Sequence, residues 1–131
     1  MIIPIKHNKK LIAYIIRANN KVKKTTFYGE KKNFLQLGFI IKNKNDSIKR
    51  HKHKKIRRII FGTSEILIVK SGKTEVTIYV KGIVVKKTIL NKNDCISLID
   101  CEHSFKFLTK TILLEIKQGP YVKNEKVIYY D

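Results

Sequence analysis

Three histidines are the side chains of this sequence best suited to chemistry inside a folded domain. His51 and His53 are separated by one residue, so on an extended chain both imidazoles point to the same side. His103 precedes Phe105 and Phe107 with the alternation of a strand, and two phenylalanines on its face predict that the face is interior. Three imidazoles from distant segments are therefore expected to meet in one pocket.

Glu65 is the fourth candidate, because it shares a strand face with Leu67 and Val69 and should also point inward. A buried carboxylate is costly unless it is paired or coordinated. Three neutral imidazoles and one carboxylate are a plausible ligand set for Fe(II), Mn(II), Ni(II) or Zn(II). The sequence thus predicts a divalent-metal site, with the alternative that the H-x-H pair in residues 49–55 is only part of a solvated run of charge.

The elements expected to position these side chains are strands. Apolar or alternating runs separated by short turns occur at 11–17, 35–41, 65–70, 74–80, 83–90, 95–99, 104–108 and 111–118. Lys81-Gly82 is typical of a two-residue hairpin turn. No segment carries a sustained helical period. These patterns predict an all-β domain with little helix, a sandwich or barrel of about eight or more antiparallel strands.

One domain is expected from 131 residues, with N-terminal strands in 1–34, a barrel in 35–118 and a C-terminal tail in 119–131 that pairs along an edge. No apolar run is long enough to span a membrane, and the N-terminus lacks the pattern of a secretion signal, so we expect a soluble, cytoplasmic protein. Cys95 and Cys101 are accordingly expected to be reduced, partly buried thiols.

The formal net charge of +19 has two interpretations. The excess is mostly Lys, spread from Lys6 to Lys126 among abundant Ile, Asn and Tyr, as a coding bias toward A/T-rich codons would produce. Alternatively it serves an anionic partner, such as a nucleotide sugar or a phosphate ester. A nucleic-acid partner is disfavoured, because readers of nucleic acid usually gather Arg on one face or interleave it with stacking aromatics.

Several of these segments resemble the cupin family. HKH at 51–53, E-x6-G at 65–72 and LNKNDCISLIDCEHSF at 90–105 are similar to its two motifs, although eleven residues separate His53 from Glu65, a gap that a longer hairpin could absorb. The stretch LLEIKQGPYVKNEKV at 113–127 looks like small cupins associated with nucleotide-sugar and surface-polysaccharide biosynthesis. The resemblance implies a jelly roll, often a homodimer, with His51, His53, Glu65 and His103 at the metal-ligand positions.

Three functions follow from this resemblance and from the residues. The first is a metal-binding cupin acting on, or accessory to, nucleotide-sugar metabolism. The second is a metal-independent 3,4-ketoisomerase or epimerase, in which His51 and His53 are the acid–base groups. The third is a non-catalytic binding module for a polyanion or small ligand. The side chains expected to contact substrate are Arg50 and Arg57 (or Arg58) for a diphosphate, Tyr79 for an enolate oxygen, and Glu115 as a pocket acid or half of an ion pair. The sequence contains no Gly-rich phosphate-binding loop, so no nucleotide cofactor is expected.

Overall fold

The computed structural model of this chain describes residues 2–124, which form ten strands and no helix. Of the tail expected to pair along an edge, residues 119–124 form no strand, and residues 125–131 lie outside the described residues. The strands are β1 (Ile2–His7), β2 (Lys10–Ile16), β3 (Thr26–Tyr28), β4 (Leu37–Phe39), β5 (Glu65–Ser71), β6 (Thr74–Val80), β7 (Ile83–Leu90), β8 (Cys95–Leu98), β9 (Glu102–Phe107) and β10 (Ile112–Lys117). The prediction of an all-β chain with at least eight strands is confirmed.

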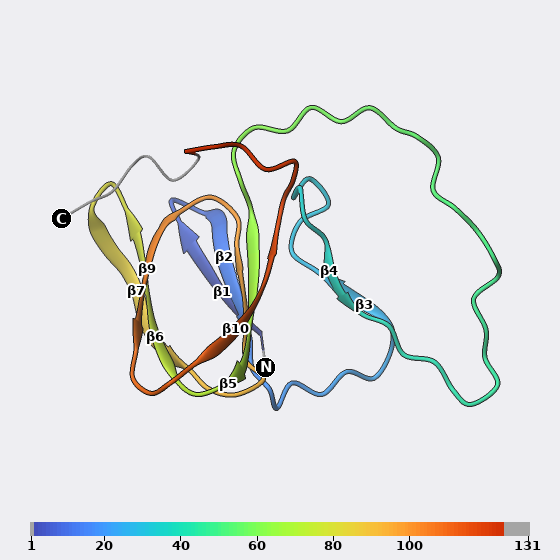
Figure 1. Ribbon diagram of the computed structural model, residues 1–131, viewed down its shortest axis with the longest axis horizontal. Helices are drawn as coiled ribbons and strands as arrows, with labels where there is room; N and C mark the ends of the chain where they lie inside the picture. The colour runs from blue at the N-terminus through green and yellow to red at the C-terminus, as the bar shows by residue number, and fades with distance from the viewer. Residues whose placement is uncertain (1, 125–131) are drawn as a thin grey trace.

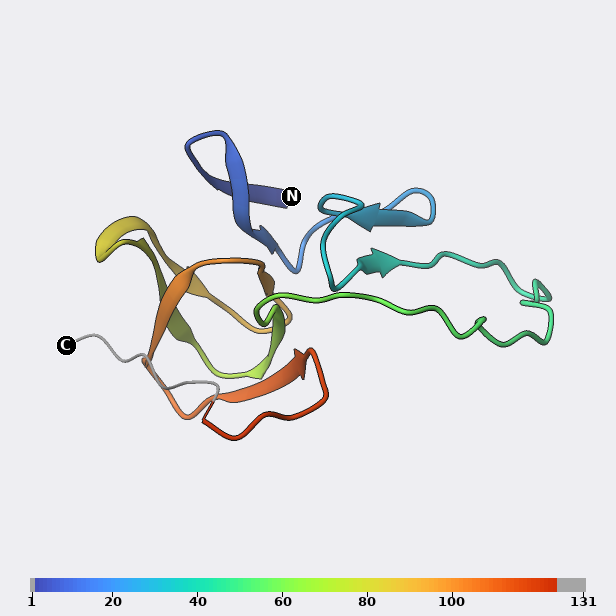
Figure 2. The same ribbon diagram turned by 90° about the horizontal axis from the view of Figure 1, so that it is seen from above.

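Two antiparallel sheets face one another, and a short hairpin lies outside them (Figures 1 and 2). The larger sheet has the order β1-β2-β8-β5-β10 and the smaller has the order β7-β6-β9. Strands β3 and β4 pair only with each other. Within the described residues each sheet is open, so the arrangement is a sandwich of two sheets and none of them closes into a barrel by its own hydrogen bonds.

The main core fills the space between the two sheets. Ile15, Val69 and Ile96 of the large sheet and Val76 and Ile78 of the small sheet are all fully buried in one apolar cluster. Val76 and Ile78, at alternate positions of the run 74–80, thus form the inward face of β6. Burial of a side chain of this size stabilises a fold by about 1.5–3 kcal/mol. This core therefore holds the two sheets against each other.

A second apolar cluster lies on the outer face of the large sheet. Tyr14, Ile16 and Ile66 are buried there, and Tyr28 and Leu37 from the β3–β4 hairpin pack against them. The hairpin therefore covers part of that face, which explains why the central strands β2 and β5 can be apolar on both sides.

Several tight turns use residues that tolerate positive φ. Lys81 and Gly82 have φ of 49° and 75°, as a two-residue type I′ hairpin turn requires, so the turn expected from the sequence is confirmed. Asn93, in the turn before β8, has φ of 67°. Asparagine accepts the left-handed region better than most residues, which suits it to this turn.

The long connection from β4 to β5 contains no strand, and residues 40–63 are all exposed. Figures 1 and 2 show this connection running away from the two sheets, beyond the β3–β4 hairpin. We call its residues 42–58 the basic arm, because they contain nine Lys or Arg side chains and only one acidic residue, Asp46. Only 37–39 of the strand expected at 35–41 form.

Candidate functional site

Glu65 and His103 meet across the two sheets at one end of the sandwich. The Oε2 atom of Glu65 on β5 lies 3.3 Å from Nε2 of His103 on β9. The side chain of Glu65 is 10% exposed and that of His103 is 29% exposed. A carboxylate at this depth is stabilised by its imidazole partner, and the imidazole remains open to solvent on one side. Of the four predicted metal ligands, the structure thus brings these two together.

The contacts of the imidazole are compatible with a proton held between His103 and Glu65. The Nδ1 atom of His103 lies 3.2 Å from the carbonyl oxygen of Cys101, and a carbonyl oxygen can only accept a hydrogen bond. In the tautomer that donates from Nδ1 to this carbonyl oxygen, a hydrogen bond between Nε2 and Glu65 needs a second proton, held either by the nitrogen or by the carboxylate. Glu65 and His103 are therefore treated as one carboxylate–imidazole pair rather than as two separate groups.

This end of the sandwich is defined by where the strands begin and end. Glu65 opens β5 and pairs in register with Leu98 at the end of β8 and with Lys117 at the end of β10. Lys117 therefore adds a half-buried cation next to the carboxylate on the same sheet. On β9, His103 is the register partner of Ile78 on β6, so the two side chains lie side by side on the inner face of the small sheet.

Both cysteines are free, as expected, and neither is activated. Burial, together with the negative charges of Asp100 and Glu65, raises the pKa of the Cys101 thiol to about 12. Burial likewise raises the pKa of Cys95 to about 11. Because the thiolate is the nucleophilic form, these thiols are unreactive near neutral pH. Cys101 packs against the core between the sheets, and Cys95 belongs to the apolar cluster on the outer face of the large sheet.

His51 and His53 lie together but apart from the Glu65–His103 pair. Their ring centroids are 5.4 Å apart, and Nδ1 of His51 lies 2.8 Å from the carbonyl oxygen of Lys49. Both are exposed on the basic arm, which runs far from β9 in both views (Figures 1 and 2). Their separation by one residue does place the rings side by side, but on a segment that pairs with no sheet.

The four predicted metal ligands therefore form two pairs. Among residues 2–124, no group of three or more His, Cys, Asp or Glu side chains is placed to hold a metal ion. In this arrangement the four side chains lie too far apart to coordinate one metal ion together. The ligand set of His51, His53, Glu65 and His103 stays a prediction.

The predicted substrate-binding residues are also divided. Arg50 and Arg57 are exposed on the basic arm. The hydroxyl of Tyr79 lies 3.1 Å from Oγ of Ser104, on the outer face of the small sheet and away from His103. Glu115 is opposite Leu67, on the same sheet face as Glu65 and one inward position further along β10. Only Glu115 thus shares a surface with the acid–base pair.

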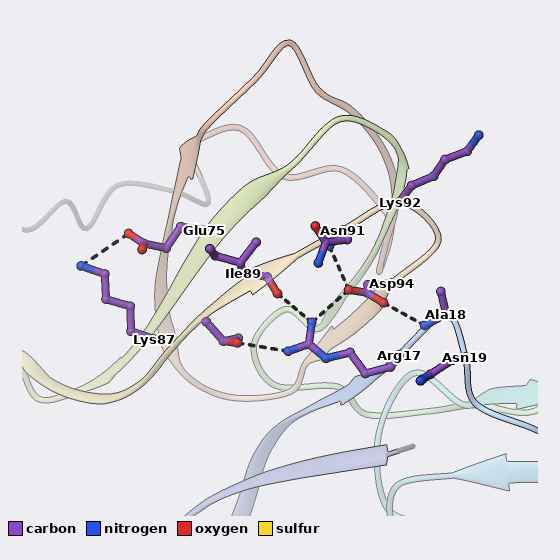
Figure 3. A pocket seen from close by; sticks show the side chains of 10 residues that line it. Arg17, Ala18, Asn19, Glu75, Lys87, Ile89, Asn91, Lys92 and Asp94 are labelled. Atoms are coloured by element: carbon purple, nitrogen blue, oxygen red, sulfur yellow. Dashed lines mark hydrogen bonds and ion pairs between the residues drawn. The ribbon is translucent and has the colours of Figure 1, made fainter.

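A shallow depression of about 890 Å³ lies elsewhere, where β2 meets the β7–β8 connection (Figure 3). At its centre, Nη1 of Arg17 donates to Oδ2 of Asp94 at 2.9 Å and to the carbonyl oxygen of Ile89 at 2.7 Å, and Nη2 donates to Oγ1 of Thr88 at 3.1 Å. The guanidinium group is thus engaged by the chain itself.

Asp94 completes this arrangement. Its side chain is 5% exposed and accepts hydrogen bonds from the backbone N–H groups of Ala18 and Asn91, each at 2.8 Å. Lys87, at the rim, forms an ion pair with Glu75 at 3.4 Å. Because these charges are paired within the protein, we interpret the depression as a structural clamp between β2 and the β7–β8 connection, and not as a ligand site.

Comparisons with protein-family models, with curated proteins and with solved structures find no match to this chain. The described residues also contain no helix long and apolar enough to cross a membrane. The class defined by fold and site is therefore a two-sheet β-sandwich with a carboxylate–imidazole pair at one end, and the cupin assignment continues as a proposal.

Sequence reasoning missed Lys117 as a neighbour of the site and Arg17 and Asp94 as the clamp. Lys117 could have been found from its spacing, since it falls two residues after Glu115 on a strand. The Arg17–Asp94 pair joins positions 77 residues apart, so no local pattern announces it.

Proposed function

We propose that this chain is a small carbohydrate-processing protein of the cupin type, whose Glu65–His103 pair moves a proton on a bound nucleotide sugar. The observation that carries the proposal is the 3.3 Å contact between Glu65 and His103 across the two sheets. Two facing antiparallel sheets are consistent with a jelly roll. A shared acid–base pair at the open end of such a sandwich suits proton transfer on a small ligand.

The reaction is an isomerisation or epimerisation beside a sugar ketone. In this proposal the Glu65 carboxylate takes a proton from the carbon beside the ketone while the imidazole of His103, 3.3 Å from Oε2 of Glu65, orients it. In the isomerisation, the pair then returns a proton to the former carbonyl carbon while the hydroxyl proton on the neighbouring carbon passes to the enolate oxygen, so the carbonyl moves by one position along the ring; in an epimerisation the proton returns to the same carbon from its other face. We propose that Lys117, the register partner of Glu65, stabilises the enolate oxygen.

Deuterium incorporation tests this proposal. The protein is incubated in D₂O with 4-keto-6-deoxy nucleotide sugars, and proton NMR follows the position next to the ketone. We expect deuterium to enter with the unmodified protein and to enter at least about a hundredfold more slowly after Glu65→Gln. Glu75→Gln is the matched control, because it makes the same change at a carboxylate of the clamp region. Absence of exchange in the unmodified protein rejects the proposal for these substrates, and equal loss in both variants rejects the site.

The metal-dependent form of this function requires the basic arm to fold back. Residues 54–64 connect His53 to Glu65 and span up to about 36–40 Å when extended, so they are long enough to double back as a hairpin. The test is elemental analysis of protein purified without an affinity tag. One metal ion per chain, lost in both His51→Ala and His103→Ala, would support the predicted ligand set. Metal content that neither variant changes would refute it.

A further inference from the structure

We propose that the basic arm is a docking segment for the surface of an anionic lipid bilayer. This inference goes beyond the proposed function and rests on residues 42–61 alone. The basic arm carries nine of the 29 Lys and Arg side chains of the protein within 17 residues. Its one acidic residue, Asp46, is engaged in a local turn, where its Oδ2 atom accepts a hydrogen bond from the backbone N–H of Asn43.

The cations of the basic arm are not neutralised within the described part of the chain. The ion pairs of Lys and Arg among residues 2–124 involve Lys10, Arg17, Lys32 and Lys87, none of which belongs to the arm. The segment is exposed throughout and projects away from the sandwich (Figure 2). A dense, unneutralised and protruding positive segment is the electrostatic footprint of a binding surface for anions.

Exposed apolar side chains on and next to the basic arm indicate which kind of anionic partner it binds. Ile56 is 61% exposed, and just beyond the arm Ile59 and Phe61 are 77% and 82% exposed. A bilayer surface with anionic headgroups takes both kinds of side chain, because Lys and Arg meet the headgroups while Ile and Phe enter the boundary of the acyl chains. A nucleic-acid backbone would engage the cations and leave these apolar side chains in water. A second copy of the chain, also at +19, would repel the arm.

Co-sedimentation with lipid vesicles tests the proposal. The probes are vesicles of phosphatidylcholine alone and vesicles in which about one lipid in three is phosphatidylserine. We expect the protein to bind only the second kind, with an affinity that falls steeply as salt is raised. Each Lys or Arg near such a surface contributes about a fivefold gain in partitioning, so removal of four should reduce binding by about a hundredfold or more.

Two variants of equal net charge separate the arm from the overall charge. The arm variant combines Lys49→Gln, Lys52→Gln, Lys54→Gln and Lys55→Gln. The control variant replaces four exposed lysines outside the arm, namely Lys23→Gln, Lys24→Gln, Lys31→Gln and Lys86→Gln. We expect the arm variant to lose at least about ten times more binding than the control. Equal losses would overturn the proposal, because they would show that only net charge matters.

A third variant tests the apolar contribution. Ile59→Ser combined with Phe61→Ser should weaken vesicle binding by about tenfold or more, because both side chains lose their place in the acyl boundary. The same variant should leave binding to a single-stranded DNA oligonucleotide unchanged. Unchanged vesicle binding in this variant, or tighter binding of the unmodified protein to the oligonucleotide than to the vesicles, would overturn the assignment to lipid.

Discussion

The Arg17–Asp94 clamp allows a quantitative prediction for Asp94→Ala. The substitution removes the acceptor of two backbone N–H groups, those of Ala18 and Asn91, and leaves the guanidinium of Arg17 without its counter-ion at a position only 24% exposed. Breaking a buried ion pair by removing one partner costs about 3–5 kcal/mol. Two lost hydrogen bonds to a charged acceptor, at about 1.5–3 kcal/mol each, give a similar figure.

The assay is urea unfolding at neutral pH. With a denaturant dependence of about 2 kcal/mol per molar urea, the midpoint of Asp94→Ala should fall by about 2 M. Asp94→Asn should fall by less, because the amide oxygen still accepts one backbone N–H group. A double-mutant cycle with Arg17→Ala should give a coupling free energy of about 1–3 kcal/mol.

Asp100→Ala is the control, and it tests whether burial or distance decides the effect on stability. Lys10 and Asp100 approach at 2.7 Å, closer than Arg17 and Asp94, but their side chains are 58% and 70% exposed. We expect no measurable shift of the unfolding midpoint there, since solvent screens an exposed pair. The reasoning is refuted if Asp94→Ala costs less than about 1 kcal/mol, or if the two substitutions have the same effect.

Four further substitutions test the fold. Gly72→Ala should cost about 2–4 kcal/mol, because φ is 87° and an added Cβ would collide with the carbonyl oxygen of Lys110, whereas Gly82→Ala, at φ of 75° with open space, should cost only about 1–2 kcal/mol. Ile78→Ala should cost about 3–4 kcal/mol in the fully buried core, as measured by urea unfolding. The folded-state pKa of Cys95, raised from 9.0 to about 11, implies stability that is fully present below pH 9 and is lost as pH rises toward 11. Cys95→Ala should remove about 2 kcal/mol of that loss, and identical pH profiles for the two proteins would contradict the assignment.

Where the fold depends on alternation and turn chemistry, the sequence predicted it well. Strands β6 and β7 have the predicted boundaries, because a period of two and a Lys-Gly turn are local properties. The inward orientation of Glu65 and of His103 was also predictable, since apolar neighbours at every second position mark the buried face. Their contact across two sheets was a consequence of the facing arrangement.

The position of the H-x-H pair could not be read from the same signals. Alternation places His51 and His53 on one side of an extended chain, and the structure agrees, since their rings lie side by side. It says nothing about whether that chain joins a sheet. The flanking residues are cations rather than the β-branched side chains that anchor a strand in a core. Charge density therefore outweighs the local alternation in this segment.

The same charge links the two proposals and gives a prediction of its own. Folding the basic arm back toward Glu65 would bring nine cations near Lys117 and the rest of a domain of net positive charge, which opposes closure unless an anion is bound there. A nucleotide sugar supplies a diphosphate, so it should draw the arm toward the sandwich and compete with anionic vesicles for the same Lys and Arg side chains. We expect saturating UDP-glucose, used as a stable nucleotide-sugar probe, to release the protein from vesicles, and UDP-glucose to bind more weakly when vesicles are present. Because linked equilibria are reciprocal, one effect without the other would refute the coupling.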